Sequence, residues 1–263
     1  MKASPVRIEW AGAVATVIID RPEQRNALDQ ATKDGLRRAL EAVGDAPAIR
    51  AMVLTGAGPA FCAGQDLREH AAALEADADA AFDTVTRDYN TIVGQIVSMP
   101  KPVIAAVCGA CVGAGLGLAL ACDLRVFSED ASLGTAFSAI GLTCDTGLSA
   151  TLGRSVGLAR AKELVLLARP FSAPDAVSWG IAGTIVPDGE VGETAHLLAA
   201  RLAAGPTAAY AASKHALETV STLTLDQALM AEGRAQAALC LTRDHQGAVR
   251  SFLDKQKPVF TGQ

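Results

Sequence analysis

Short apolar runs and longer segments of helical spacing take turns along this chain. Three largely aliphatic runs have the length of buried strands, and they occupy residues 14–20, 51–55 and 124–127. Segments with helical spacing follow them: a loop and a helix at residues 26–43, and helices at residues 67–99 and 156–167. Because strand and helix repeat in this order, we expect parallel strand pairing and an α/β fold.

The pattern changes after about residue 191, where strand-like runs cease. Helical spacing continues there, at residues 195–202, 208–220 and 225–241. The sequence therefore predicts an α/β body over residues 1–194 and a helical C-terminal region over residues 195–263. Within the body, the alanine run at residues 71–81 is expected to be a solvated helix or a mobile cover.

The uncharged stretch at residues 103–122 has two interpretations. Its length could span a bilayer, and Gly109, Gly113 and Gly117 have the four-residue spacing found where membrane helices pack together. Its first five residues favour a strand, however, and each glycine would cost a helix about 1 kcal/mol relative to alanine. We therefore favour a buried strand, a glycine turn and a buried helix, in which glycines let backbone N–H groups approach a ligand closely.

The composition is that of a soluble α/β protein, and it narrows the range of partners. Half of the 263 residues are apolar and 19% are charged, so a large core can form. The net charge of −5 argues against a nucleic-acid partner, because nucleic-acid binders carry basic patches. The first nine residues lack the apolar core of a signal peptide, so we expect a cytoplasmic protein without membrane contact.

The six cysteines and four histidines give no sign of a metal or redox site. Cys108 and Cys111 match the spacing C-x-x-C, but glycines follow them and no second pair completes a zinc site. Cysteines among apolar neighbours are expected to be small core residues. The histidines lie far apart, and we expect surface or helix-packing positions for His70, His196, His215 and His245.

Five motifs in succession resemble the crotonase family, the enoyl-CoA hydratases and isomerases. They are DRPEQRNAL at residues 20–28, TGAGPAFCAGQDL at 55–67, KPVIAAV at 101–107, GAGLGLALACD at 113–123 and KPVF at 257–260. The resemblance covers nearly the whole chain in the family's order. It implies an α/β, crotonase-like spiral of ββα units with a C-terminal helical oligomerisation region, assembled as a homotrimer or a dimer of trimers. It also implies acyl-coenzyme A thioesters as substrates, with no cofactor besides them.

The resemblance assigns binding roles to particular positions. Two backbone N–H groups of the family hold the thioester oxygen as negative charge develops, and they fall on Gln65 and Ala114. Glycines beside both positions could free the backbone for this role, or could merely permit tight helix–sheet packing. The Ala63 carbonyl is implied near the adenine of coenzyme A, and Arg25 and Lys257 near its phosphates. Both cations could equally be solvated surface charges.

The chain departs from hydratases at the two positions where they carry water-activating glutamates. Those positions are Gly117 and Phe137 here. Addition of water needs a hydroxide equivalent and a proton delivered together, and without the two carboxylates there is no obvious acid–base pair. We therefore expect weak or no hydratase activity, and an acyl pocket lined by Gly117, Phe137 and Ile140.

Asp145 stands where ring-type enoyl-CoA isomerases of the family keep a working aspartate. One carboxylate suffices to remove a proton beside the thioester and return it two carbons further on. Apolar neighbours at Phe137, Ile140 and Leu142 could raise the pKa of Asp145 by desolvation. We expect Asp145 to be the catalytic base of an enoyl-CoA isomerase; the alternative is that it only caps the helix that follows.

Other functions stay open at this point. The chain could hydrate enoyl-CoA with atypical residues, or bind acyl-CoA without turnover after losing the family's glutamates. A dehalogenase would use Asp145 as a nucleophile, but the histidine and tryptophan of that subgroup correspond to Asn90 and Phe137. Cys144 is disfavoured as a nucleophile because no histidine lies near it in the sequence.

Overall fold

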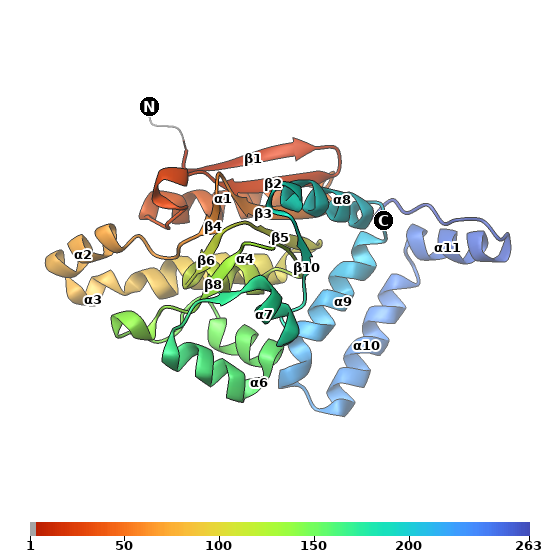
Figure 1. The fold of residues 1–263 in the computed structure, drawn as a ribbon. Helices are drawn as coiled ribbons and strands as arrows, with labels where there is room; N and C mark the ends of the chain where they lie inside the picture. The colour runs from red at the N-terminus through yellow and green to blue at the C-terminus, as the bar shows by residue number, and fades with distance from the viewer. Residues whose placement is uncertain (1–3) are drawn as a thin grey trace.

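The computed structural model describes residues 4–263. Residues 1–3, which begin both the predicted body and the segment considered for a signal peptide, lie outside the described residues, as do the side chains of residues 78 and 79. Two sheets form the centre of the molecule and helices surround them. The last helices form an arm that projects to one side (Figure 1).

The larger sheet contains all three strands that the apolar runs predicted. Its strand order is β1-β2-β3-β5-β7-β10. The first two strands pair antiparallel and the remaining neighbours pair in parallel, which confirms the expected parallel pairing. The strands are Val6–Ala11 (β1), Val14–Ile19 (β2), Ala51–Gly56 (β3), Val103–Val107 (β5), Leu124–Ser128 (β7) and Thr184–Val186 (β10).

The smaller sheet is made of short strands, in the order β4-β6-β8-β9. They are Ala60–Cys62 (β4), Ala110–Val112 (β6), Ser132–Gly134 (β8) and Phe171–Ser172 (β9). The chain thus passes repeatedly from a strand of the larger sheet to one of the smaller sheet and then to a helix. The run β5, β6 and α5 (Ala114–Ala121) is one such unit. This spiral of ββα units confirms the predicted fold class.

Alternation of side chains along the strands gives the larger sheet two buried faces. Along β5, Val103, Ala105 and Val107 belong to one core, whereas Ile104 and Ala106 belong to the other. The second core is closed by α8 (Val191–Ala203), which buries an alanine-rich stripe: Val191, Ala195, Ala199 and Ala203. The predicted division at residue 194 stays a prediction, and α8 runs across that position.

The helical segment expected over residues 67–99 is helical but interrupted. The chain forms α2 (Leu67–Ala76), α3 (Ala78–Ala81), a π-helix (η2, Val85–Tyr89) and α4 (Asn90–Ser98). Asp77 has extended backbone angles, which no continuous helix allows. The segment consequently bends around one edge of the body, where α2 and α3 project (Figure 1).

The remaining helices agree with the predictions in part. The helix expected at residues 156–167 begins earlier, as α6 (Leu148–Leu167), and Gly157 breaks it with a positive φ of 74°. The helices expected at residues 208–220 and 225–241 are α9 (Thr207–Thr219) and α10 (Leu225–Leu239). The other helices are α1 (Gln30–Asp45), α7 (Ala173–Ser178) and α11 (Arg243–Leu253).

The uncharged stretch at residues 103–122 is confirmed as a strand, a turn and a helix. It forms β5, β6 and the buried α5, with Gly113 at a positive φ of 56° immediately before α5. Among residues 4–263, no helix is long and apolar enough to cross a membrane.

Candidate active site

A small apolar cavity of about 120 Å³ lies between the α2–α4 segment, the end of β6 with the start of α5, and residues 135–145. Five stretches of chain line it: residues 63–70, residues 82–89, the turn before α5, residues 135–142 and Asp145. Most of the lining side chains are apolar, including Leu67, Phe82, Val85, Phe137 and Leu142. A bound acyl group would therefore be largely removed from water.

Two backbone N–H groups at the wall of this cavity have no protein acceptor. Ala114 is the first residue of α5, so its N–H has no partner within the helix. Gln65 pairs with Leu28 in an isolated β-bridge, but the residues beside Gln65 make its hydrogen bonds. The Leu28 N–H donates to the Gly64 carbonyl at 2.8 Å, and the Asp66 N–H donates to the Leu28 carbonyl at 3.1 Å. Within the described residues, neither the Gln65 nor the Ala114 N–H donates a hydrogen bond.

Gly64 brings these two donors together. A Cβ at Gly64 would lie 2.9 Å from the Val112 carbonyl oxygen and 3.4 Å from the Ala114 nitrogen, and its φ is +87°. A side chain would therefore push the two segments apart. The glycines do permit tight packing, as the alternative interpretation held, and that packing brings the backbone beside Gln65 close to Ala114 at the positive end of α5.

The Gln65 loop is fixed from its other side by ionic contacts. The carboxylate of Asp66 caps α2, accepting from the N–H groups of Arg68 at 3.1 Å and Glu69 at 3.3 Å. The guanidinium of Arg21 lies 3.0 Å from the other Asp66 oxygen. These contacts hold the loop before any ligand arrives, which is what stabilising a developing charge requires.

Asp145 is the one carboxylate that lines the cavity within the described residues. Its Oδ1 atom is buried and has no hydrogen-bond partner. Burial raises the pKa of Asp145 to about 6, against a smaller opposing effect of the Thr146 hydroxyl. The alternative that Asp145 only caps α6 is wrong, because Gly147 is the N-cap residue and no side chain caps the helix.

The backbone after Asp145 is strained. Thr146 is buried and has a φ of 51°, a left-handed conformation that is rare for a β-branched residue. Strain of this kind costs of the order of 1–3 kcal/mol and persists only where surrounding packing imposes it. Gly117 of α5 supplies that packing, because a Cβ there would lie 1.8 Å from Thr146 Oγ1 and 2.6 Å from Thr146 Cβ.

Of the three predicted pocket residues, Phe137 and Ile140 line the cavity and Gly117 does not. The space into which a side chain at position 117 would extend is occupied by Thr146. Position 117 therefore acts on the cavity only indirectly, by letting the segment that carries Asp145 approach α5.

Four polar residues of the cavity were not predicted: Thr84, Tyr89, His70 and Thr135. Tyr89 and Thr84 face it from the π-helix and its start, and His70 faces it from α2, with its ring edge against Phe82. His70 thus packs against Phe82 from α2, as expected of a helix-packing histidine, and it also lines the cavity. Asn90, which corresponds by resemblance to a pocket residue of the dehalogenases, is exposed and absent from the lining.

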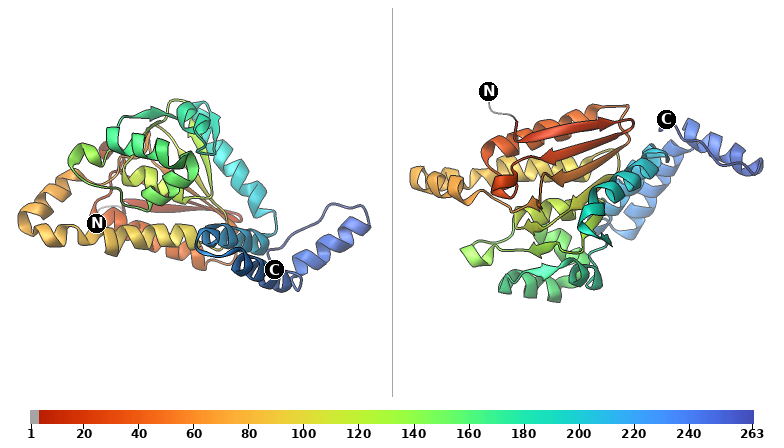
Figure 2. Two further views of the ribbon diagram at one scale, coloured as in Figure 1. Left: turned by 90° about the horizontal axis from the view of Figure 1, so that it is seen from below. Right: turned by 45° about the horizontal axis from the view of Figure 1, so that its top comes forward.

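The residues expected to bind coenzyme A fall into two groups. Arg25 and Ala63 are adjacent, because the Ala63 N–H donates to the Arg25 carbonyl at 3.0 Å. Lys257 lies in the exposed tail after α11, and α11 stands at the opposite end of the molecule from α2 (Figures 1 and 2). One chain therefore does not bring Lys257 to Arg25, and its phosphate contact stays a prediction.

The cysteines form no ligand cluster in the described part of the chain. Cys111, Cys62 and Cys122 are buried, as expected of core residues, whereas Cys108 is half-buried and Cys240 is exposed. Burial raises the pKa of the Cys108 thiol to about 11, so it is a poor nucleophile. No group of three or more His, Cys, Asp or Glu side chains among these residues could hold a metal ion.

Comparison with known proteins gives matches along the whole chain. The sequence model of the enoyl-CoA hydratase/isomerase family matches residues 9–263. The "Probable enoyl-CoA hydratase" of Rhodobacter capsulatus is 40% identical and covers 100% of both chains. The 1,2-epoxyphenylacetyl-CoA isomerase of Escherichia coli K12 is 38% identical over 95% of both. A solved structure from Mycobacterium abscessus, named for the same family, is 44% identical, covers 98% of this chain and 100% of its own, and has a TM-score of 0.94.

Proposed function

This chain belongs to the crotonase (enoyl-CoA hydratase/isomerase) family, and we propose that within it the protein is an enoyl-CoA isomerase. The observation that supports this choice is the half-buried Asp145 carboxylate, which lines an apolar cavity and whose Oδ1 atom is buried without a hydrogen-bond partner. Beside the cavity lie two unused backbone donors, Gln65 and Ala114. One base and one oxyanion site are the groups that a 1,3-proton shift needs.

The proposed reaction begins when the Asp145 carboxylate takes a proton from the carbon between the thioester and the double bond of a 3-enoyl-CoA. The electron pair of that C–H bond moves into a dienolate, whose oxygen accepts hydrogen bonds from the Gln65 and Ala114 N–H groups. Asp145 then returns the same proton two carbons further from the thioester, which leaves a conjugated 2-enoyl-CoA. Each oxyanion donor contributes about 3–4 kcal/mol to a transition state of this kind.

Burial adapts Asp145 to both halves of this cycle. A carboxylate with an ordinary pKa near 4 is a weak base, whereas a pKa of about 6 makes it a stronger base that is still ionised at pH 7. The proposed reaction needs no resident cofactor, because the thioester carbonyl of the substrate accepts the electron pair.

The size of the cavity supports a compact acyl group. Its volume of about 120 Å³ is close to that of a cavity of about 150 Å³ that holds benzene in another protein. We therefore propose acyl groups of a few carbons or one ring as substrates. The relative named 1,2-epoxyphenylacetyl-CoA isomerase is named for a substrate with a ring, which is consistent with a compact or ring-containing acyl group here.

Hydratase activity is the competing function, because some relatives are named hydratases. Hydration requires a second group that delivers or receives a proton together with the water. Asp145 is the only carboxylate in the described lining, and Phe137 occupies a position where the family's hydratases keep a glutamate. We therefore expect hydration to be weak.

The test is to supply purified protein with a short-chain 3-enoyl-CoA and to follow formation of the conjugated 2-enoyl thioester by ultraviolet absorbance. A parallel sample receives a 2-enoyl-CoA, whose hydration removes the same absorbance. We expect isomerisation, slowed at least about 100-fold in Asp145→Asn, and little hydration. Fast hydration without isomerisation would make the protein a hydratase, and tight acyl-CoA binding without any turnover would make it a non-catalytic binder.

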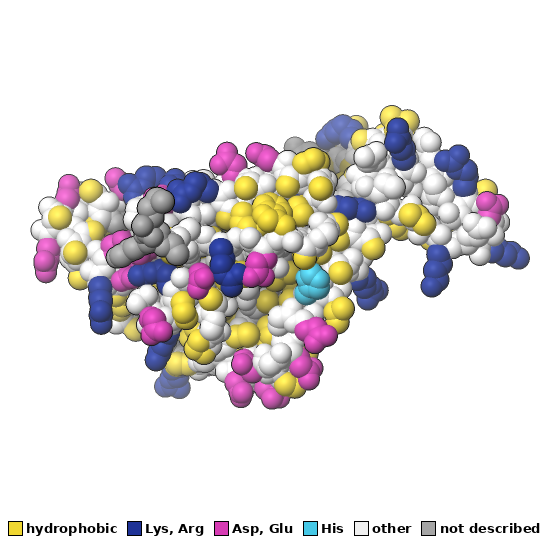
Figure 3. All heavy atoms as spheres, turned by 90° about the horizontal axis from the view of Figure 1, so that it is seen from above, with side chains coloured by type: hydrophobic (Ala, Val, Ile, Leu, Met, Phe, Trp, Pro, Cys, Tyr) yellow, Lys and Arg dark blue, Asp and Glu magenta, His cyan; other side chains and the backbone are white. Residues whose placement is uncertain are grey.

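We also propose that the protein acts as a homo-oligomer, either a trimer or a dimer of trimers. Helices α9–α11 and the turns that join them leave large apolar side chains in solvent, among them Leu217, Leu225, Leu241, Phe252 and Leu253. Exposed apolar surface of this extent is typical of a protein interface. On the face shown in Figure 3, Lys and Arg side chains lie at several points along the projecting arm, beside hydrophobic ones.

A further inference from the structure

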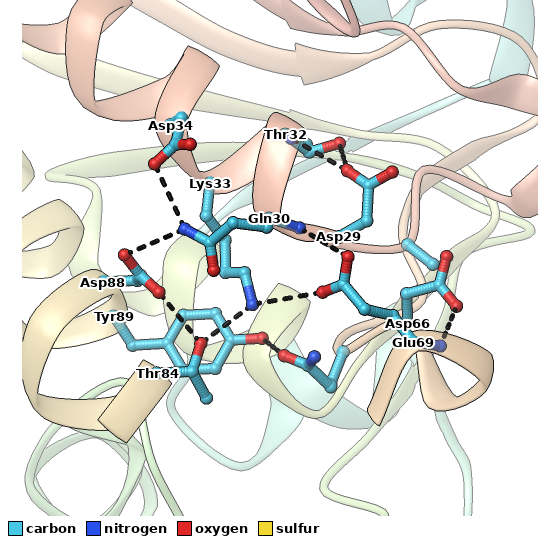
Figure 4. Close-up of polar contacts among 12 residues, drawn as sticks. Asp29, Gln30, Thr32, Lys33, Asp34, Asp66, Glu69, Thr84, Asp88 and Tyr89 are labelled. Atoms are coloured by element: carbon cyan, nitrogen blue, oxygen red, sulfur yellow. Dashed lines mark hydrogen bonds and ion pairs between the residues drawn. The ribbon is translucent and has the colours of Figure 1, made fainter. Parts of the chain in front are cut away.

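Tyr89 connects the wall of the cavity to the Gln65 loop, which we call the oxyanion loop because it carries the Gln65 N–H. Its side chain is 1% exposed, and its hydroxyl donates a hydrogen bond to the side-chain oxygen Oε1 of Gln65 (Figure 4). Gln65 is also the residue whose backbone N–H stands free at the cavity. A change in the Tyr89 contact would therefore reach that N–H through a single residue.

The π-helix explains why Tyr89 lies in the cavity. A π-turn contains one residue more than an α-turn, so it rotates the side chains that follow, and such turns are frequent at functional sites. Here the turn Val85–Tyr89 leads into α4, with Tyr89 buried at the cavity and Asn90 exposed to solvent. A regular α-helix through these residues would orient the tyrosine differently.

A buried polar network fixes Tyr89 from behind. The ammonium group of Lys33, on α1, is 5.6 Å from the centre of the Tyr89 ring and donates to the Thr84 hydroxyl at 2.8 Å. Thr84 donates in turn to Asp88 at 3.1 Å. Burial alone would raise the pKa of Asp88, but hydrogen bonds from Arg87, Gln30 and Thr84 hold it below its usual value, so Asp88 is charged. Figure 4 shows this network between α1 and the π-helix.

The same lysine also contacts the helix that follows the oxyanion loop. Glu69, in the first turn of α2, lies 3.6 Å from the Lys33 ammonium and accepts from the Gln30 N–H at 3.0 Å. The Lys33 side chain is only 2% exposed, and a buried ammonium of this kind is stabilising only where its donors are satisfied. Lys33 therefore joins both walls of the cavity, the π-helix and α2, to α1.

We propose that Tyr89 is a positioning residue for catalysis, which holds Gln65 so that its N–H points at the thioester oxygen, and that Lys33 holds Tyr89. This role rests on the proposed function, because it requires the oxyanion site at Gln65. Tyr89 stays protonated at any working pH, since burial and the nearby Asp145 charge both raise its pKa. Its hydroxyl is thus a permanent donor to Gln65 rather than a second acid.

The test uses Tyr89→Phe, which removes the hydroxyl and keeps the ring that packs in the wall. Butanoyl-CoA with ¹³C at the thioester carbonyl is bound to each protein, and the carbonyl stretch is measured by difference infrared spectroscopy. An engaged oxyanion hole lowers this frequency. We expect lowering in the wild type, clearly less lowering in Tyr89→Phe, and a fall in isomerisation kcat of about tenfold with a nearly unchanged KM.

The chain offers a matched control, because its second tyrosine, Tyr210, lies on α9 away from this cavity. Tyr210→Phe should leave both the carbonyl frequency and kcat at wild-type values. A Tyr89→Phe protein with the wild-type carbonyl frequency and kcat would overturn the role, even if it melted at a lower temperature. A wild type that does not lower the frequency at all would overturn the oxyanion hole itself, and the role of Tyr89 with it.

Lys33→Met tests the support behind the tyrosine. The variant keeps the length of the side chain and removes its charge, and circular dichroism establishes that it folds. We expect the same direction of change in carbonyl frequency and kcat as in Tyr89→Phe. A folded Lys33→Met protein with wild-type values would remove Lys33 from the proposal, while Tyr89→Phe tests the tyrosine whether or not the lysine variant folds.

Discussion

Asp145 combines two properties that stability alone would not favour. Its Oδ1 atom is buried without a hydrogen-bond donor, and the residue after it has a strained backbone. A carboxylate left in this state is destabilising in its charged form. Such an arrangement is typical of a functional site, where the cost of desolvation is the source of basicity.

The first prediction concerns pH and activity. Because the base must be ionised and its pKa is about 6, kcat/KM for isomerisation should rise with pH up to about 6 and level off above it. The measurement is the initial rate at low substrate from pH 4.5 to pH 8.5. A profile that is flat down to pH 4.5 would mean that Asp145 has an ordinary pKa or is not the base.

The second prediction concerns pH and stability. The raised pKa means that the folded protein holds the Asp145 proton more tightly than the unfolded chain does, so the free energy of unfolding falls as pH rises from about 4 to about 6. Asp145→Asn should therefore be more stable than the wild type at pH 8, by about 1–2 kcal/mol once partial exposure is allowed for. In urea unfolding, the difference in free energy of unfolding between Asp145→Asn and the wild type should be about half as large at pH 5 as at pH 8. A difference of the same size at both pH values would contradict the raised pKa of Asp145.

The third prediction concerns Gly117. Alanine there would force Thr146 to move, which should cost about 1–3 kcal/mol of stability and displace Asp145. We expect Gly117→Ala to bind acyl-CoA but to lose isomerase activity. The control is Gly94→Ala on α4, where a Cβ meets nothing within 4 Å, and which should keep full activity. Full activity in Gly117→Ala would show that the close approach of Thr146 is unimportant.

At this scale, the sequence was informative where its motifs carried the family resemblance. That resemblance implied the pairing of Gln65 with Ala114, and the structure brings Gly64 close to Ala114. Tyr89 could not be found in this way, because a single inserted residue in the π-helix changes which side chain faces the cavity. Side-chain spacing alone does not reveal such a turn.

At the scale of elements, Lys101 is an example of a buried charge with a structural purpose. Its ammonium group donates to the carbonyl oxygens of Val43 at 2.7 Å, Ala46 at 3.0 Å and Gly44 at 3.2 Å, which end α1. The last carbonyls of a helix have no partner within it, and a cation there also offsets the helix dipole. Lys101 therefore joins the end of α1 to the start of β5.

The fourth prediction follows from these contacts. Lys101→Met should lower the free energy of unfolding by about 2–3 kcal/mol, because buried carbonyls lose their donor. Activity of the folded protein should not change, since Lys101 does not line the cavity. The exposed Lys162 on α6 is the control, and Lys162→Met should unfold like the wild type. Equal midpoints for the two variants in urea would contradict the capping role.

Elements were predictable where one period dominated. The long strands β2, β3 and β5 have largely apolar runs because both faces of their sheet are buried, whereas β7 is apolar and buried mainly at Val126 and Phe127. The strands of the smaller sheet are two or three residues long, too short for any period to appear. The breaks between α2 and α4 were missed because helical spacing resumes on either side of each break.

At the scale of the whole molecule, the fold separates the chemistry from the projecting arm. The cavity lies beside α2, whereas α10 and α11 extend away from the opposite side of the body (Figure 2). The tail is nevertheless held in place: Asp244 accepts from the Thr261 N–H at 2.6 Å and from the Gly262 N–H at 2.8 Å. A fixed arm with exposed apolar side chains is suited to contact another copy of the chain.

The fifth prediction tests this assembly. Sedimentation equilibrium should give the mass of a trimer or a hexamer for the wild type, and a smaller species for Phe252→Asp, which places a charge on α11. Trp10→Asp is the control for Phe252→Asp, because it places the same charge on an exposed apolar residue of β1. A monomeric wild type would contradict the proposed oligomer. The motifs implied this state through family resemblance, and one chain cannot display it.

Isomerisation by this protein requires enolate formation by Asp145, and one experiment tests that step without knowledge of the natural acyl group. Phenylacetyl-CoA carries acidic protons beside the thioester and has no double bond to move, so an enzyme that forms its enolate can only exchange those protons. The protein is incubated with it in D₂O, and the CH₂ signal is followed by ¹H NMR. We predict that the signal disappears with the wild type and persists with Asp145→Asn, whereas equal exchange by both proteins, or none by either, would contradict the central claim.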